Sequence, residues 1–585
     1  MAIMRHGLIP LAALVAGTVA LRECPDTSSA EYDYIVVGAG AGGGPVAARL
    51  AETGFSVLVV DVGHDVNNYN TTIPNYLARV LYDPQIELSY TLNEYPKGFP
   101  YTRDDVWYPR GRALGGSAIH NAVVNNVANT RRDFANLESM FGQSWEMERL
   151  RKLFVDIEDN LYIPNHCDKG NGQYSEGMEH DLQTSHVCDH GYHGWLKTNT
   201  IQQDILAKFN DAQLNNITAG LLSAAPFIPD LNSRASVDAT GFSLASNTID
   251  ENNARSSVYN RLVAVRDAHP DRLQFAYDTL ATKILLCKDC DGEEPRAVGV
   301  EIARGQGLPV QSDFHRKRHL KTEKVFARNE VIVAAGTFQT PQLLMLSGIG
   351  DKEQLCEFGI DSVVHLPGVG KNLQGASRLL LVTRDLTHSF LDHDEISTTW
   401  LLKDNHTLVN GCTFGSDPAT DPCLADYLAT RKNIYGLGIA IGHITYKSDD
   451  SLEEPDMDIY WAPAYFPGFV RNVGDLITHT PNALTAVALR AHPSSRGTVA
   501  LTGSHPQDEL RIDKNHFQND GGATDVAALR DGVKMARAIV ESSANIAPFV
   551  THELFPGANY TTDEDIEMHV YEHVFGELSI HERCV

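Results

Sequence analysis

Three glycines and one aspartate near the N-terminus have the residue types and the spacing of a dinucleotide-binding site. Gly38, Gly40 and Gly43 form the pattern G-x-G-x-x-G, and Asp61 follows 18 residues after Gly43. Such glycines permit a tight turn and allow a pyrophosphate to approach the backbone, while the carboxylate can accept hydrogen bonds from a ribose. The pattern therefore predicts that the chain binds a dinucleotide.

A strand, a helix and a second strand are needed to hold these residues in place. Residues 34–37 are a short apolar run typical of a buried strand, residues 45–50 have helical character, and residues 56–60 supply another strand. The helix would present free N–H groups and the positive end of its dipole to the phosphates. The unit predicts an α/β fold with a Rossmann-like domain.

A second glycine-rich block lies at residues 107–126. Gly111, Gly115, Gly116 and Ser117 place bare backbone beside small side chains, which suits the close approach of a flat or phosphorylated ligand. An ordinary glycine-rich turn is the alternative interpretation.

This second block resembles the first signature of the GMC (glucose-methanol-choline) oxidoreductases. Residues 336–350, GTFQTPQLLMLSGIG, resemble the second signature of the same family. The resemblance implies FAD as the cofactor, with residues 121–124 near the flavin and Ala281 near the adenine. The cofactor-binding residues expected on both grounds are Gly38, Gly40, Ala41, Gly42, Gly43, Asp61, Val62, Gly111, Gly115, Gly116, Ser117, Asn121, Ala122, Val123, Val124, Ala281 and Gly336.

The resemblance also implies a discontinuous FAD-binding domain with an inserted, sheet-rich α+β substrate domain. At 585 residues the chain is too long for a single core. We expect the FAD-binding domain with its insertions at residues 31–350 and the substrate domain at residues 351–545. Residues 546–585 are expected to be a truncated or divergent return to the FAD-binding domain.

Aromatic residues are spread over the expected substrate domain. Trp400, Trp461, Tyr465 and Phe466 could line an aromatic pocket. Each of them, taken alone, is more often a core residue than a ligand contact.

Members of the family place a catalytic histidine after a helix like residues 563–575. That histidine takes the proton of an alcohol while hydride passes to the flavin. Residues 577–585 look unrelated to the family pattern, so we expect the catalytic segment to be missing and FAD to be retained weakly or not at all. His573 and His581 are interpreted as packing or solvent-facing residues and His492 as structural, and no catalytic base is named.

The activity that the resemblance implies is oxidation of an alcohol by hydride transfer to FAD. Dioxygen or another electron acceptor would reoxidise the flavin. The sequence looks most like fungal members that act in secondary metabolism, which favours an aryl or polyketide-derived alcohol over a sugar. Two alternatives remain open, namely a non-redox flavoprotein cyclase of such a pathway and a truncated, inactive family member.

The composition argues against other classes of partner. The 48 basic and 75 acidic residues give a net charge of −27, which would repel nucleic acids and anionic membranes. No later segment is long and apolar enough to suggest a transmembrane anchor. Cys287 and Cys290 form a single C-x-x-C without a second pair, so no metal site is expected.

The N-terminus and the sequons indicate the secretory pathway. Residues 1–20 combine a basic start, an apolar stretch and small residues at a plausible cleavage site, as in a signal peptide. We therefore expect a secreted or lumenal protein. Its expected glycosylation sites are Asn70, Asn216, Asn405 and Asn559.

In an oxidising compartment the cysteines are expected to pair. Cys412 with Cys423, and Cys167 with Cys188, are the favoured local pairs. Cys287 and Cys290 would form a loop disulfide or remain two inert thiols. The total of nine leaves at least one thiol unpaired.

Overall fold

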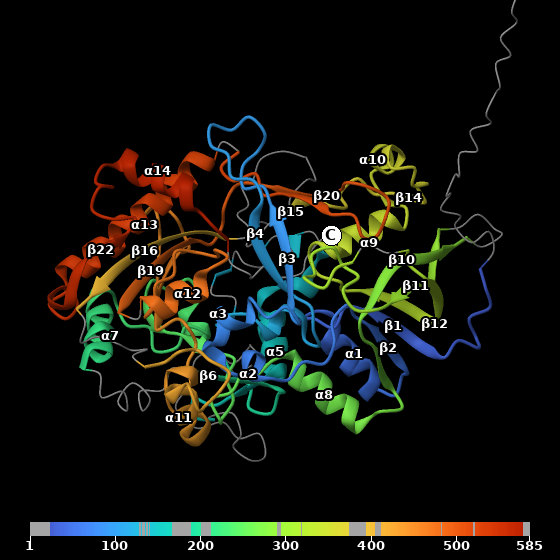
Figure 1. Cartoon of the computed structure of the whole chain (residues 1–585), viewed down its shortest axis with the longest axis horizontal. Coiled ribbons are helices and arrows are strands. Elements are labelled where there is room, and N and C mark those ends of the chain that lie inside the picture. The colour runs from blue at the N-terminus through green and yellow to red at the C-terminus, as the bar shows by residue number, and fades with distance from the viewer. Residues whose placement is uncertain are drawn as a thin grey trace, which may run out of the picture.

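The computed structural model describes most of the chain. The described residues are 24–127, 130–131, 135, 138–139, 141–165, 189–200, 212–288, 294–316, 319–373, 393–403, 411–480, 482–518 and 521–576. Two six-stranded sheets organise them, and the two sheets lie on opposite sides of the view in Figure 1. The predicted signal peptide and Asn405 lie outside the described residues.

The first sheet has the strand order β10-β11-β12-β1-β2-β9. Strands β1 (Tyr32–Val37), β2 (Val57–Val60), β9 (Leu273–Ala276) and β12 (Thr322–Val333) are parallel, and β10 (Thr279–Cys287) and β11 (Arg296–Arg304) extend the sheet in antiparallel fashion. All four residues of β2 are buried, as expected for a parallel strand covered on both faces. The predicted Rossmann-like core is confirmed.

Alternate residues of these strands face different cores. Val36 and Val59 pack with helices α1 (Gly43–Glu52) and α8 (Val258–Ala268). Ile35 and Leu58 belong to the opposite core, which also contains Leu343 of helix α9 (Gln339–Leu346). The period of two along each strand therefore places helices on both sides of the sheet.

The second sheet is antiparallel, with the order β22-β16-β19-β18-β17-β7. Its strands are β7 (Gly241–Leu244), β16 (Asp394–Leu402), β17 (Gly442–Tyr446), β18 (Met457–Ala462), β19 (Ala483–Arg490) and β22 (Val550–Phe555). The long helix α13 (Gly522–Ser542) contacts β16, β18 and β19, and α14 (Asp563–His573) packs on α13. Trp400 and Trp461 stack at 6.2 Å within this core, and Phe466 is also buried, so these three are core residues.

The predicted domains do not coincide with the two sheets. Strand β7 lies within residues 31–350 but pairs with β17 of the second sheet. Strand β22 and helix α14 were expected to return to the FAD-binding domain, and this is wrong, because β22 pairs with β16 and α14 packs against the same sheet. These pairings join segments far apart in the chain, which local sequence patterns do not reveal.

Two smaller sheets cover the first sheet at one end. Strands β3 (Glu87–Leu92) and β4 (Val106–Gly111) form a hairpin, and β15 (Lys371–Leu373), β20 (Gly497–Leu501) and β21 (Leu510–Asp513) form a three-stranded sheet. Apolar residues of both sheets share a core with α9. The hairpin is thereby held beside the end of the Rossmann-like core.

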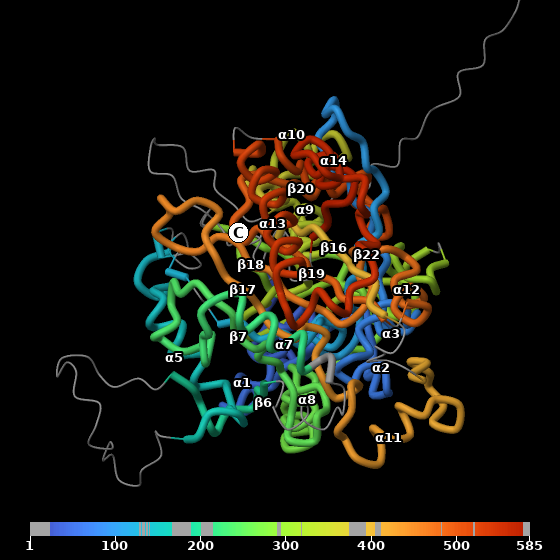
Figure 2. The backbone as a smooth tube through the Cα atoms, turned by 90° about the vertical axis from the view of Figure 1, so that its left-hand side faces the viewer, coloured from blue at the N-terminus to red at the C-terminus, as the bar shows by residue number. Residues whose placement is uncertain are grey.

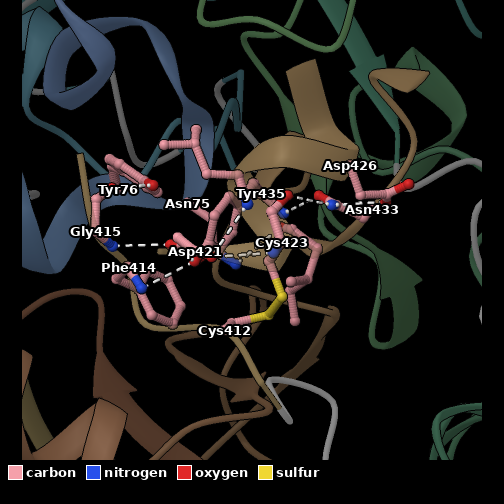
Figure 3. Close-up of a disulfide and its surroundings, with 12 residues drawn as sticks. Asn75, Tyr76, Cys412, Phe414, Gly415, Asp421, Cys423, Asp426, Asn433 and Tyr435 are labelled. Atoms are coloured by element: carbon pink, nitrogen blue, oxygen red, sulfur yellow. Dashed lines mark hydrogen bonds between the residues drawn. A yellow bond between two sulfur atoms is a disulfide. The ribbon is translucent and has the colours of Figure 1, made fainter. Parts of the chain in front are cut away.

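The disulfides agree in part with the prediction. Cys412 and Cys423 are bonded, as expected, and Asp421 caps helix α11 (Pro422–Thr430) beside them while also accepting the hydroxyl of Tyr435 at 2.7 Å (Figure 3). The expected pairing of Cys287 is wrong, because Cys287 is bonded to Cys24, 263 residues earlier. Cys356 is an exposed free thiol. Cys167, Cys188 and Cys290 lie outside the described residues.

A buried ionic cluster connects the hairpin to the second sheet. His516 lies between two carboxylates, with Nε2 at 2.8 Å from Glu94 Oε2 and Nδ1 at 2.7 Å from Asp394 Oδ1. Lys514 Nζ is 3.7 Å from Glu94, and all four side chains are at most 1% exposed. Although burial alone would lower it, the two carboxylates raise the pKa of His516 to about 9. The imidazolium and the Lys514 ammonium together therefore neutralise the two carboxylates.

Replacing His516 tests the contribution of this cluster to stability. Because the folded pKa lies above the unfolded value, the stabilisation should be complete below pH of about 6.5 and disappear as the pH rises through about 9. His516→Gln should cost about 3–5 kcal/mol at neutral pH, since the buried Asp394 carboxylate loses its cationic partner and Glu94 keeps only Lys514. Urea denaturation between pH of about 6 and 10 measures both effects.

The exposed His479 on helix α12 (Val473–His479) supplies the control for this substitution. His479→Gln should leave the denaturation midpoint and its pH dependence unchanged. An alkaline loss of stability that persists unchanged in His516→Gln would show that another group causes it.

Candidate active site

A cavity with about 850 Å³ of empty space lies beyond the carboxyl ends of β1 and β2. This is the edge of a parallel sheet where ligands bind in doubly wound folds. Its wall is built from the glycine-rich turn after β1, the end of β2, the start of β10, the hairpin β3–β4 and the turn before α9. The predicted residues that line it are Gly38, Gly40, Asp61, Val62, Gly111, Gly116, Ser117, Ala281 and Gly336.

The glycines in this wall are required because backbone passes close to backbone. Gly38 has φ +104°, and a Cβ there would lie 2.0 Å from the carbonyl oxygen of Ala334. Gly116 has φ +55°, and its Cβ would lie 2.7 Å from Cα of Gly40. The first and second glycine-rich blocks therefore touch each other, and together they expose bare backbone to the cavity.

Asp61 organises the turn that surrounds the cavity. Its Oδ2 accepts the backbone N–H of Ala39 at 2.7 Å, and Oδ1 accepts that of Gly63 at 2.7 Å. Burial raises the pKa of Asp61 despite these bonds. The carboxylate thus binds the glycine-rich turn to the end of β2, in the place predicted for a ribose acceptor.

The other predicted residues of the glycine-rich blocks support the wall from behind. Gly43 begins helix α1, and Gly115 donates its N–H to the carbonyl of Ala39. Ala41 and Gly42 lie in the same turn and do not line the cavity. The sequence interpretation missed lining residues on the hairpin and on α9, namely Leu88, Tyr90, Arg110 and Gln342.

Residues 121–124 are placed between the two sheets and do not line this cavity. Arg255 donates from Nη1 to Oδ1 of Asn121 at 2.6 Å and from Nη2 to its carbonyl at 3.0 Å. Val123 is buried with φ +57°, and its carbonyl accepts the N–H of Thr248. The segment is therefore held rigidly, and its proximity to the flavin stays a prediction.

His120 is a neutral imidazole directly behind the cavity wall. Its ring packs so closely on Gly111 that a Cβ at Gly111 would lie 2.4 Å from His120 Cδ2. Within the described part of the chain, neither ring nitrogen has a hydrogen-bond partner. Burial, together with the charges of Arg110 and Arg255, lowers the pKa of His120 to about 3.

The other described histidines considered from the sequence do not line this cavity. His569 of α14 bonds the carbonyl of Ser397 at 3.1 Å, and His573 bonds the carbonyl of His569 at 3.3 Å. Both pack against Phe555, which confirms a packing role for His573. His492 is buried at 1% exposure, as a structural residue would be, and His581 lies outside the described residues.

Comparison with known proteins relates this chain to a protein family. Two models of GMC oxidoreductases match the chain, at residues 222–376 and 493–582. Over these two regions the chain resembles the GMC oxidoreductase family. It is similar to alcohol dehydrogenase [acceptor] of Pseudomonas putida (26% identity, 92% of this chain and 82% of the relative) and to pyranose dehydrogenase of Agaricus campestris (28% identity, 94% and 84%).

Solved structures of several oxidases share the fold. A formate oxidase matches with a TM-score of 0.72 at 20% identity, covering 94% of this chain and 87% of that one. A fungal aryl-alcohol oxidase matches with a TM-score of 0.62 at 18% identity, covering 93% and 88%. The predicted α/β architecture with a sheet-rich substrate domain is confirmed.

One prediction about the C-terminus is not supported. The C-terminal GMC oxidoreductase model matches as far as residue 582, so the expectation that the catalytic segment is missing is not supported. The expected weakness of FAD retention was argued from that missing segment and loses its basis.

The residues around the cavity fit FAD as the cofactor. The glycine cradle at Gly38 and Gly40 leaves no room for side chains where a pyrophosphate would approach. Asp61, directly after β2, and Ala281 of β10 line the same cavity. The wall offers backbone N–H donors, small hydroxyls and one carboxylate acceptor, which is the chemistry that a dinucleotide needs.

The three described sequon asparagines differ in how exposed they are. Asn559 is exposed in a loop, whereas Asn216 on helix α7 (Ala212–Ala224) is half-buried and Asn70 donates its amide to Asp83 at 2.9 Å.

None of the described helices is long and apolar enough to cross a bilayer. The described residues contain no group of three or more metal-ligating side chains.

Gly38→Ala should abolish FAD binding, because the new methyl group would collide with the Ala334 carbonyl oxygen. Gly54→Ala is a matched control, since Gly54 has a similar φ of +106° but open space around its Cβ position. The control should lose only about 1–2 kcal/mol of stability from backbone strain. The flavin content of each purified protein, measured after denaturation, distinguishes them. Equal flavin content in both variants would contradict the assigned cradle.

Proposed function

We propose that this chain oxidises a small-molecule alcohol by hydride transfer to FAD held in the cavity beyond β1 and β2. The observation that carries the proposal is the contact of the two glycine-rich blocks at Gly40 and Gly116, which leaves bare backbone around the cavity beyond β1 and β2. An aryl or polyketide-derived alcohol is preferred to a sugar. Dioxygen or another acceptor completes the cycle.

When bound, FAD supplies the hydride acceptor. The chain contributes the groups that would bind and orient it: the N-terminus of α1 and the glycine-rich turn would hold the pyrophosphate, and Asp61 would accept hydrogen bonds from the ribose. Leu88 and Tyr90 of β3 close the wall with apolar surface that excludes water. Neutral His120 behind Gly111 can accept a hydrogen bond but is too weak a base to hold a proton at neutral pH.

The base that takes the alcohol proton is proposed to come from the C-terminal region. The family match there includes His581, which supports testing this residue against His120. A general base with an ordinary histidine pKa suits proton abstraction near neutral pH.

Secretion and N-glycosylation belong to the same proposal. Two disulfides among the described residues fit an oxidising compartment. The exposed sequon at Asn559 is the best placed for a glycan. A non-reduced mass measurement and glycopeptide analysis of the secreted protein test both points.

Anaerobic mixing with alcohols tests the reaction. A benzylic alcohol such as 4-methoxybenzyl alcohol should bleach the visible flavin absorption at least about tenfold faster than glucose, since apolar contacts discriminate by about that factor. His581→Ala should slow bleaching without lowering FAD content, whereas His120→Gln should chiefly change FAD content or its spectrum. Conversion of a substrate with no bleaching would favour the non-redox cyclase, and no effect of His581→Ala would remove it as the base.

A further inference from the structure

The turn between β20 and β21, residues 502–509, contributes Pro506 to the wall of the cofactor cavity. The other described residues that line the cavity belong to the first sheet, to the hairpin β3–β4, to the turns beside them and to α9. Strand β20 lies beside α9 in both Figure 1 and Figure 2, which brings this turn next to the cavity. The cavity is therefore closed in part by a segment that belongs to the three-stranded sheet.

Short internal hydrogen bonds give the turn its shape. The backbone N–H of His505 donates to Oδ2 of Asp508 at 2.9 Å, and the N–H of Asp508 donates to the carbonyl of His505 at 2.9 Å. Thr502, at the exposed start of the turn, donates its hydroxyl to the carbonyl of Glu509. These bonds lie within the turn and do not attach it to the rest of the cavity wall.

Two side-chain amides attach the turn to its surroundings. Gln342 of α9, which lines the cavity, donates from Nε2 to the carbonyl of Asp508 at 3.3 Å. Gln507 donates from Nε2 to the carbonyl of Leu308, in the loop between β11 and β12, at 2.6 Å. The turn is thus tied to two separate elements that lie outside its own sheet.

The bond from Gln507 is shielded from water. Gln507 is 4% exposed and Leu308 is 1% exposed, and Leu308 packs with Leu280 and Val62, which both line the cofactor cavity. Within the described part of the chain, Oε1 of Gln507 has no hydrogen-bond partner, so the amide is held through Nε2. Because a buried carbonyl that loses its donor has no water to replace it, this bond opposes outward movement of the turn.

We propose that residues 502–509 form a strap across the cofactor cavity and that the amide of Gln507 keeps this strap closed, an inference that rests on FAD binding as proposed above. The strap opens to admit or release FAD and closes over the bound cofactor. The bond from Gln507 to Leu308 breaks before Pro506 can leave the wall. Gln507 itself does not line the cavity, so it is a positioning residue that acts through the strap.

Exchange kinetics distinguish a strap from an ordinary wall contact. When the closed strap predominates with and without FAD, weakening its anchor raises the rates of FAD entry and exit by the same factor, so the dissociation constant hardly changes. Loss of a residue that merely contacts FAD raises the exit rate and the dissociation constant together.

The test measures the exchange of bound FAD against excess radiolabelled FAD on the loaded protein, together with the dissociation constant of FAD. Gln507→Ala should accelerate exchange at least about tenfold, as expected for the loss of one buried hydrogen bond, while the dissociation constant changes by less than about threefold. Thermal unfolding of the loaded protein shows that the variant is folded.

Gln507→Glu keeps the size of the side chain and adds a second readout. At a pH of about 8 its carboxylate cannot donate to the carbonyl of Leu308, so exchange should be fast. At a pH of about 5 the carboxylic acid, whose pKa is raised by burial, can donate its O–H to the same carbonyl, so exchange should slow. His505 and Asp508 are present in both proteins, so the pH dependence of the unsubstituted protein accounts for their titration.

Two substitutions serve as matched controls. Gln518→Ala makes the same change at an exposed glutamine beyond β21, and Thr502→Val removes a bond inside the strap without touching its anchor. Both should leave the exchange rate unchanged. An exchange rate that is unchanged in Gln507→Ala, or raised equally in the controls, would overturn the inference.

Flavin measurements separate this inference from the proposed function. Equal rises in the exchange rate and the dissociation constant would overturn the strap and leave FAD-dependent oxidation standing. Exchange that depends on Gln507 in a protein whose flavin no alcohol bleaches would contradict the proposed oxidation and retain the strap. A chain that takes up no FAD would contradict both.

Discussion

The close passage of Gly38 past Ala334 is the constraint on which the cofactor site depends. Strands β1 and β12 are parallel neighbours, with Val37 opposite Val333, so both chains leave the sheet at the same point. Both turns must then fit into one space, and each begins or ends at a glycine with positive φ, Gly38 and Gly336. The cavity exists because these two turns diverge without side chains between them.

Buried charged groups fix contacts between distant segments of the chain that apolar packing does not specify. Arg255 holds Asn121 by two hydrogen bonds, although the segment belongs to a different part of the chain. His516 is surrounded by carboxylates from the hairpin and from β16. Buried charges of this kind are costly unless their partners are in place, so they favour one arrangement of the two sheets over slightly shifted alternatives.

The sequence predicted the parts of this site that are local in the chain. Gly38, Gly40 and Asp61 follow from spacing within one strand–helix–strand unit, and Ala281 and Gly336 followed from the family resemblance. Tyr90 and Arg110 were missed because their position depends on the pairing of β3 with β4.

Long-range pairing also explains the errors in the predicted organisation. The partner of Cys287 is 263 residues away, and no local spacing indicates it. Strands β7 and β22 join the second sheet from regions assigned elsewhere, because antiparallel edge pairing is decided by the packed sheet rather than by the strand itself. His120 lies in the second glycine-rich block. Only the structure shows that, among the described residues, neither of its ring nitrogens has a hydrogen-bond partner.

The bond between Cys24 and Cys287 encloses both glycine-rich blocks in one covalent ring. Cys287 ends β10, the strand whose beginning lines the cofactor cavity, so a pull on residue 24 is transmitted to β10 through the disulfide as well as to β1 along the chain. A protease-coupled unfoldase that engages the chain near Cys24 must therefore pull two segments of the backbone at once. Until the disulfide is reduced, the cofactor-binding turn is protected from being stretched out in sequence order.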